Sequence, residues 1–242
     1  MAPSLLPEIR GKVKMAGRQK VGAVIAAAGS SQRMNGPDKL FALLGERPVL
    51  ARVIDTFQKC EAIDQIVVVL SSQNLKQGEK LAAGQNWSKV TGICPGGERR
   101  QDSVVAGLDK LKGCQWAVIH DGARPFVTEE LIEYGLENAQ ETGASIAAVP
   151  VTDTIKVAGA DQIVQGTPPR NNLWAVQTPQ VFRYDIISEA YRRLKYDVTD
   201  DSRAVEQLGY KVKIYMGDYN NIKITNPDDL AVAQVLWQKY GN

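Results

Sequence analysis

Histidine and cysteine are scarce in this chain of 242 residues, and that scarcity excludes several kinds of active site. There is one histidine, His120, and the three cysteines are far apart with no CxxC spacing. A single histidine rules out a histidine-based zinc site and any triad that needs a separate histidine base. The cysteines support neither a zinc ribbon nor a disulfide framework. With no secretory signal in view, we expect a cytoplasmic protein.

Strong charge and long apolar runs are also missing. The formal net charge is +2, and residues 1–20 account for the excess because they hold five basic residues and one acid. The remaining residues hold 24 basic and 26 acidic side chains, whereas a general nucleic-acid binder would carry a basic stripe on its body. No stretch approaches about 18 apolar residues. We therefore expect neither a nucleic-acid partner nor a membrane span.

Residues 1–20 are expected to form a disordered leader, because an ordered apolar pattern begins only at Val21. A basic arm that touches nucleic acid or anionic lipid is the alternative. The segment is too short and too poor in serine for an organelle transit peptide, so a plastid stroma is not favoured.

From Val21 onward, short apolar runs alternate with stretches of helical spacing, and runs without polar alternation are typical of strands buried on both faces. Strands are expected at Val21–Ala26, Gln65–Leu70, Lys89–Ile93, Trp116–His120, Ser145–Val149 and Val212–Met216. Helices are expected at Val49–Cys60, Leu75–Ala83, Arg100–Leu111, Thr128–Thr142, Tyr184–Leu194, Asp200–Leu208 and Asp228–Trp237. The alternation predicts an α/β fold with a mostly parallel sheet flanked by helices. Ligands then bind beyond the carboxyl ends of the strands.

The alternation breaks between Asp153 and Asn172. Two short polar stretches around a turn predict a β-hairpin arm that protrudes from the main sheet at about residues 152–171. We expect such an arm to contact a second subunit or a substrate.

The first of three polar clusters at predicted strand ends is Ala26–Lys39, which combines small residues and Gly29 with Arg33 and Lys39. Small residues let backbone N–H groups approach a phosphate or a base, and a cation after the turn can neutralise phosphoryl charge. The segment matches neither the Walker A pattern nor GxGxxG. An ordinary strand-to-helix turn is the alternative.

The second cluster, Gly96–Ser103, places two glycines before a helix whose free N–H groups suit an anion or a base carbonyl. The third, His120–Pro125, puts Asp121 at a strand end, where a carboxylate can bind Mg²⁺, with Arg124 beside it. Simple turns with capping residues, and a structural role for His120, are the alternatives.

Seven segments together resemble one family of enzymes in order and spacing. They read AAAGSSQRM…DK, GGERRQDSV, HDGARP, PVTDTIK, RNNLWAVQTPQ, TDDSRAVE and NNIKITNPDDL, and they extend over about residues 21–238. The chain resembles the 2-C-methyl-D-erythritol 4-phosphate cytidylyltransferases of the non-mevalonate isoprenoid pathway. The resemblance implies a Rossmann-like nucleotidyltransferase domain at 21–242, with CTP and a polyol phosphate as substrates and Mg²⁺ as cofactor. It also implies a homodimer in which the arm reaches the partner's site.

The resemblance assigns roles at the nucleotide. The residues that would line CTP with backbone groups or read the cytosine are Ala27, Ala28, Gly29, Gly97 and Ser103. The catalytic cations, which would bind the triphosphate and stabilise the transition state, are Arg33, Lys39 and Lys223.

The resemblance also assigns roles at the acceptor. Asp121 would lie at the metal and near the sugar alcohol, and Arg124 would support the same turn. Thr154 and Arg170 of the other subunit would hold the methylerythritol phosphate. Further matching segments contain Thr178 and Thr199-Asp200.

The sequence departs from the family pattern at three places. Ser31 replaces a frequent glycine, and Gly122 stands where alanine is common. The gap between Arg33 and Lys39 is one residue shorter than in some members.

Three other functions are weighed against this one. A ribitol 5-phosphate cytidylyltransferase would share the core motifs, although PVTDTIK and PPRNNLW favour methylerythritol. A non-catalytic CTP-binding protein would not need the full set of cations. A dehydrogenase that uses NAD predicts GxGxxG after the first strand, which this chain lacks.

Overall fold

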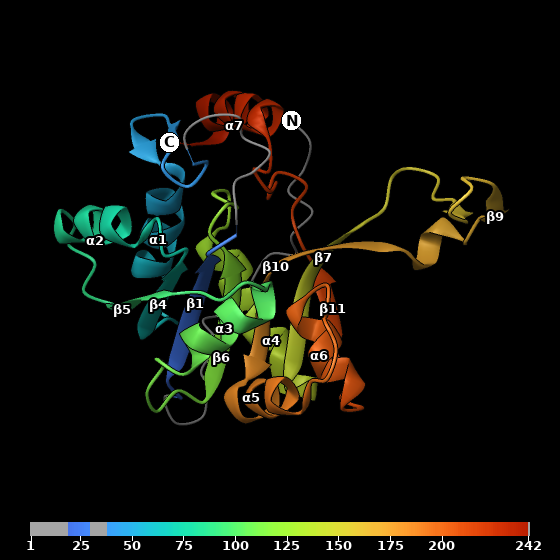
Figure 1. The fold of residues 1–242 in the computed structure, drawn as a ribbon, viewed down its shortest axis with the longest axis horizontal. Helices are drawn as coiled ribbons and strands as arrows, with labels where there is room; N and C mark the ends of the chain where they lie inside the picture. Colours follow the sequence, from blue (N-terminus) through green and yellow to red (C-terminus); the bar gives the residue numbers. More distant parts are fainter. Residues whose placement is uncertain (1–18, 30–37, 242) are drawn as a thin grey trace.

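A computed structural model describes residues 19–29 and 38–241. Most of the predicted leader, together with Ser31 and Arg33, lies outside the described residues. The described part holds a central seven-stranded sheet with helices on both faces, which confirms the predicted α/β class (Figure 1).

The sheet has the strand order β11-β7-β10-β6-β1-β4-β5. Its strands are β1 (Val21–Ala27), β4 (Gln65–Leu70), β5 (Val90–Pro95), β6 (Trp116–Asp121), β7 (Ala144–Pro150), β10 (Trp174–Arg183) and β11 (Lys213–Met216). β1 pairs in parallel with β4 and β6, whereas β10 is antiparallel to both of its neighbours. The sheet is therefore mostly parallel, as predicted, and the one reversed strand, β10, lies between β7 and β6.

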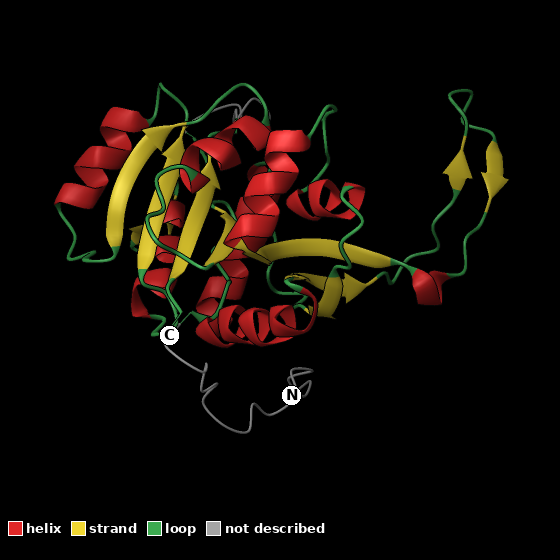
Figure 2. Ribbon diagram, turned by 90° about the horizontal axis from the view of Figure 1, so that it is seen from below, coloured by secondary structure: helices red, strands yellow, loops and turns green. Residues whose placement is uncertain are grey.

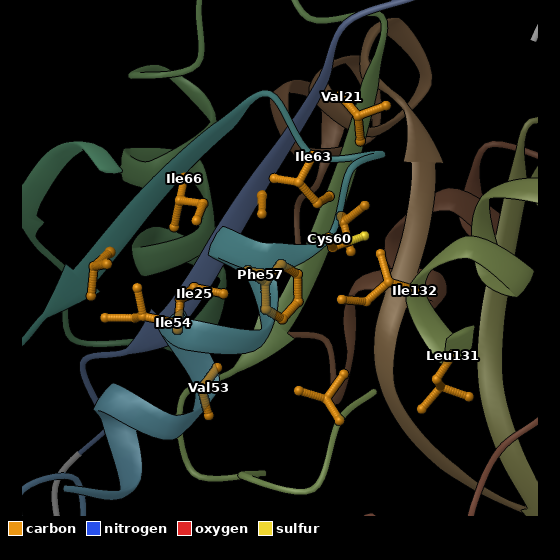
Figure 3. Packing of buried hydrophobic residues seen from close by; sticks show 14 of the residues in the cluster. Val21, Ile25, Val53, Ile54, Phe57, Cys60, Ile63, Ile66, Leu131 and Ile132 are labelled. Carbon is orange, nitrogen blue, oxygen red and sulfur yellow. The ribbon is translucent and has the colours of Figure 1, made fainter. Parts of the chain in front are cut away.

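Helices cover both faces of the sheet. They are α1 (Val49–Lys59), α2 (Leu75–Ala83), α3 (Arg100–Leu108), α4 (Glu129–Thr142), α5 (Tyr184–Arg193), α6 (Asp201–Gln207) and α7 (Pro227–Tyr240). Side chains of α1 and α4 pack on one face, where Phe57 and Ile132 share a core cluster with Ile25 of β1 (Figure 3). Side chains of α3, α5 and α6 pack on the other face. β1 contributes alternate residues to the two cores, because successive side chains of a strand point to opposite faces.

The local signals for α4 are confirmed. Thr128 is the N-cap, and its hydroxyl accepts a hydrogen bond from Leu131 N at 3.2 Å. Gly143 ends the helix at a φ of 81°, a left-handed conformation that glycine adopts without strain. Gly209 has a φ of 83° after α6, as expected for a residue that closes a helix.

The sequence pattern missed β10, a central strand of ten residues. Pro179 interrupts its apolar pattern, and proline within a run argues against a central strand. The strand tolerates Pro179 because its register with β7 shifts between Val176 and Gln180, next to the cis peptide bond Thr178-Pro179. The short strands β2 (Leu43–Leu44) and β3 (Arg47–Pro48) were missed as well.

The predicted arm is present as a hairpin of β8 (Val157–Ala158) and β9 (Val164–Gly166). It projects well away from the sheet and helices (Figure 2). Its apolar side chains are exposed, with Ile163 at 65% and Val164 at 56%. A short 3-10 helix, Arg170–Asn172, leads from the arm back into β10.

Among the described residues, no helix combines the length and apolar character that crossing a bilayer requires.

Candidate active site

Two cavities meet at the carboxyl end of β6. One has a volume of about 500 Å³ and is lined by residues that follow β1 and β5, including Ala28, Gly29 and Gly97. The other has a volume of about 650 Å³ and extends from β6 along β10 to the start of α6. Arg100, Asp121 and Lys223 line both cavities. The site can therefore hold two molecules that meet at these three side chains.

Small residues let two loops come together at the 500 Å³ cavity. A Cβ atom on Gly96 would lie 2.4 Å from Cβ of Ala28 and 2.5 Å from Oγ of Ser103. Such distances are far inside van der Waals contact, so any larger residue at position 96 would push the loops apart. Ser103 is buried against this contact, and its hydroxyl bonds the Arg99 carbonyl at 3.2 Å.

The start of α3 is fixed by its own side chains. Asp102 accepts hydrogen bonds from Arg99 N at 3.3 Å and from Arg99 Nε at 2.9 Å. Arg99 also bonds Asp197 at 2.8 Å, which ties α3 to the loop before α6. The glycine-rich loop of one cavity is thereby linked to the loop that carries Thr199 and Asp200 in the other.

The Asp121 carboxylate lies among three cations. The Nζ atom of Lys223 is 2.8 Å from Oδ2, Nη2 of Arg100 is 3.2 Å from Oδ1, and Nε of Arg124 is 3.5 Å from Oδ2. Burial alone would raise the pKa of the Asp121 carboxyl. The charges of Arg100, Lys223 and Arg124 outweigh burial and hold that pKa well below its ordinary range. Asp121 is therefore ionised throughout the physiological pH range.

Arg100 bridges Asp121 to a second, fully buried carboxylate. Its Nη2 atom lies 2.9 Å from Oδ2 of Asp201, and the Tyr191 hydroxyl donates a hydrogen bond to Oδ1. Burial raises the pKa of Asp201, and the charge of Arg100 offsets only part of that effect. The two carboxylates raise the pKa of Arg100 against its own burial, so its guanidinium stays charged.

His120 lies behind this cluster and has a structural role, which was the alternative considered for it from the sequence. Its Nε2 atom lies 3.1 Å from the Arg124 carbonyl, which can only accept, so Nε2 carries the proton. Nδ1 then accepts from the Thr178 hydroxyl at 3.0 Å, and that oxygen accepts from Asp121 N at 3.0 Å. Burial lowers the pKa of His120 to about 4. The ring holds the turn at Asp121 and is not exposed to a reacting group.

Most of the site residues expected from the sequence converge here. Those that line one or both cavities are Ala27, Ala28, Gly29, Lys39, Gly97, Ser103, Asp121, Arg124 and Lys223. Arg33 lies outside the described residues. Thr154 and Arg170 lie on the arm and line neither cavity of the described chain. Arg170 instead bonds the Thr152 carbonyl at 2.6 Å.

The sequence did not predict a role for Arg100 or Asp201. Both residues lie in segments that resemble the family, GGERRQDSV and TDDSRAVE. No local pattern marks them, because only the packing of α3 against the start of α6 brings their side chains together.

The side chains at the junction of the two cavities could hold Mg²⁺ through a single carboxylate. Within the described ranges no group of three or more His, Cys, Asp or Glu residues forms a cage for a metal. Mg²⁺ is commonly held by one or two carboxylates with phosphate oxygens and waters. Asp121, at the junction of the two cavities, fits the single protein ligand of such a site, provided that Lys223 turns toward phosphate.

The mostly parallel sheet, the loop of small residues after β1 and the cationic junction at the carboxyl edge define a nucleotidyltransferase of Rossmann-like architecture. The family model described as "IspD: 2-C-methyl-D-erythritol 4-phosphate cytidylyltransferase" matches residues 21–239. The chain belongs to this family and is a cytidylyltransferase.

Several members of the family are similar to this chain over nearly their whole length. A 2-C-methyl-D-erythritol 4-phosphate cytidylyltransferase of Dehalococcoides mccartyi is 52% identical over 91% of this chain and 97% of its own. One from Alkaliphilus oremlandii is 42% identical over 90% and 94%. The crystal structure of 4-diphosphocytidyl-2C-methyl-D-erythritol synthase from Anaerococcus prevotii superposes with a TM-score of 0.82 at 31% identity, covering 91% of this chain and 97% of that one. The ribitol 5-phosphate alternative is accordingly not favoured.

Proposed function

We propose that the chain transfers the cytidylyl group of CTP to 2-C-methyl-D-erythritol 4-phosphate. A phosphate oxygen of the acceptor bonds to the α-phosphorus of CTP, and the bond from that phosphorus to the bridging oxygen of pyrophosphate breaks. The products are CDP-methylerythritol and pyrophosphate. The observation that carries this proposal is the pair of cavities that meet at Asp121, Lys223 and Arg100.

CTP occupies the 500 Å³ cavity in this proposal. The backbone of Ala27, Ala28 and Gly29 lines the nucleotide, and Gly97 and Ser103 read the cytosine. Free N–H groups at the start of a helix and small residues nearby suit a base carbonyl or a phosphate. Lys39 and Lys223 line the same cavity and bind the triphosphate, together with Arg33.

The acceptor occupies the 650 Å³ cavity. Asp121 and Arg124 form its inner end, next to the nucleotide. The arm of a second subunit supplies Thr154 and Arg170 to the acceptor phosphate. Val157, Ile163 and Val164 are exposed close together on the arm, and this supports a homodimer, because grouped exposed apolar side chains mark interaction surfaces.

Catalysis is assigned to positioning and electrostatics. A phosphate monoester is already an anionic nucleophile, so the site needs no strong general base. The difficulty is that two anions must approach, and Arg33, Lys39 and Lys223 reduce their repulsion and stabilise the charge on the leaving pyrophosphate. Mg²⁺, held by Asp121 and phosphate oxygens, would neutralise further phosphate charge.

A pyrophosphate-release assay tests the function. The chain is mixed with CTP, Mg²⁺ and methylerythritol 4-phosphate, and we expect pyrophosphate and CDP-methylerythritol in equal amounts. ATP or UTP in place of CTP, and ribitol 5-phosphate in place of the acceptor, should give far slower release. Chelation of the metal should stop turnover, and added Mg²⁺ should restore it. Binding of CTP without release for any acceptor would favour the non-catalytic alternative.

A further inference from the structure

Arg100 lies at the centre of a chain of contacts that starts outside both cavities. The Tyr191 hydroxyl of α5 bonds Asp201 at the start of α6, Asp201 pairs with Arg100, and Arg100 pairs with Asp121. Tyr191 and Asp201 line neither of the two cavities of the described chain. Their link to the Asp121 carboxylate runs through Arg100.

The three cations around Asp121 are held differently. The Lys223 side chain is 40% exposed, its stem is flexible, and it forms an ion pair with Asp121. Arg100 instead contacts both carboxylates, and its planar guanidinium is fixed by the Asp201 side chain, which is 1% exposed. Lys223 is free to turn toward an incoming phosphate, whereas Arg100 is not.

Turning Lys223 toward phosphate removes one of the contacts that orient Asp121. The acceptor also brings negative charge close to the Asp121 carboxylate. A carboxylate held by Lys223 alone would then swing or exclude the acceptor. Arg100 and Arg124 keep their contacts with it, so its position does not depend on where Lys223 is.

We infer that Arg100, anchored by Asp201 and Tyr191, is a positioning residue that holds the Asp121 carboxylate at the junction of the cavities while Lys223 engages phosphate. The inference rests on the proposed function. It assigns Asp201 and Tyr191 to the machinery of the acceptor site although neither touches a substrate.

The test uses Tyr191→Phe and Asp201→Asn in the full chain, with Glu189→Gln as the matched control. Glu189 also lies on α5 and loses an ion pair on substitution, but its partner is Arg193 at 2.6 Å on the same helix. For each variant, kcat and KM are measured for both substrates. The dissociation constant of CTP is measured by titration without acceptor, and folding is followed by the melting temperature.

We expect kcat/KM for the acceptor to fall about tenfold in Tyr191→Phe and more in Asp201→Asn, since small displacements of a catalytic group cost large factors in rate. The CTP dissociation constant should stay within about twofold, because neither Tyr191 nor Asp201 lines the cavity assigned to CTP. Arg100→Lys replaces the planar guanidinium that contacts both Asp121 and Asp201. In that background, Tyr191→Phe should lower kcat/KM for the acceptor little further. Glu189→Gln should match the wild type.

Several results would overturn the positioning role. One is an unchanged acceptor kcat/KM in Tyr191→Phe, which decides the matter even where Asp201→Asn does not fold. Another is an equal loss of CTP affinity and acceptor turnover that follows the fall in melting temperature, since that pattern marks general loosening. A wild-type chain that releases no pyrophosphate would contradict the proposed function, and this role with it.

Discussion

The ammonium nitrogen of Lys223 lies 2.8 Å from Oδ2 of Asp121 and so joins the loop before α7 to the end of β6. Two further bonds hold that loop against the turn after β6. Ile224 N donates to the Ala123 carbonyl at 2.9 Å, and Arg124 Nη1 donates to the Asn221 carbonyl at 2.7 Å. The backbone that carries Lys223 is therefore fixed although its side chain is partly exposed. A fixed backbone with a movable ammonium group suits a residue that must reach phosphate.

Substitution of Lys223 by alanine should leave the chain folded and lower kcat by about 10²–10³ at saturating CTP, equivalent to about 3–4 kcal/mol of transition-state stabilisation. The measurement is steady-state pyrophosphate release. The control is Lys213→Ala, because Lys213 is also a partly exposed lysine in an ion pair, with Glu141, at the surface of β11. A near wild-type kcat in Lys223→Ala would end the electrostatic mechanism.

Substitution of Arg33 by alanine should have an effect of the same size, about 10²–10³ in kcat, because it removes one of the cations assigned to the triphosphate. Arg193→Ala serves as the control, since Arg193 forms its ion pair along α5 with Glu189. A circular dichroism spectrum and a melting temperature like those of the wild type would show that Arg33→Ala lowers kcat without unfolding the chain. Full turnover would mean that Arg33 is not one of the catalytic cations.

The sequence predicted the parallel part of the sheet because each strand there is a continuous apolar run bounded by turn residues, as in Gln65–Leu70, whose predicted and observed ends coincide. It marked Asp121 as a possible metal ligand from its place at a predicted strand end, whereas Lys223 was predicted only through the family resemblance. Neither segment predicts the contact between the two side chains, since that contact depends on the strand order and on the loop before α7.

The parts that escaped prediction have long-range causes. Pro179 argues locally against a strand, yet β10 pairs with β6 and β7 on both sides. Arg100 and Asp201 meet because α3 and α6 pack on the same face of the sheet. Charges that are buried by tertiary packing carry no mark in the sequence around them, and this is why the second carboxylate of the cluster was missed.

The arm is expected to act on the site of the partner subunit, and mixing two inactive variants tests this. Arg170→Ala removes the arm cation, and Lys223→Ala removes the cation of the cavity. If the arm acts in trans, a mixed dimer has one intact site, and random mixing should restore about a quarter of wild-type activity. The mixture is unfolded, refolded together and assayed for pyrophosphate release.

Each variant refolded alone is the control for that experiment, and both should stay inactive. Activity that does not rise on mixing would contradict an arm that serves the other subunit. Sedimentation of the wild-type chain as a monomer would contradict the dimer itself.

His120 should make stability depend on pH below neutrality. Burial lowers its pKa from 6.5 to about 4, and its ring lies against Phe57 with a centroid distance of 5.3 Å. Between pH 6.5 and 4 the unfolded chain binds a proton that the folded chain does not. The contribution of His120 to the free energy of unfolding is therefore fully present above pH 6.5, the pKa of the ring in the unfolded chain. It is lost as the pH falls through this window, by on the order of 3 kcal/mol in total.

This can be measured because His120 is the only histidine in the chain, so one imidazole gives all the ring signals. Proton NMR of the folded chain should show no titration above pH 5 or so, while the chain unfolded in urea titrates near its ordinary value. Urea unfolding at a series of pH values should give a free energy of unfolding that falls in acid. His120→Gln should show a smaller slope, because its side chain cannot titrate, whatever its absolute stability. A folded-state pKa near 6.5 would mean that water reaches the His120 ring. That result would contradict a buried, neutral His120 as the partner of Thr178 in the turn that carries Asp121.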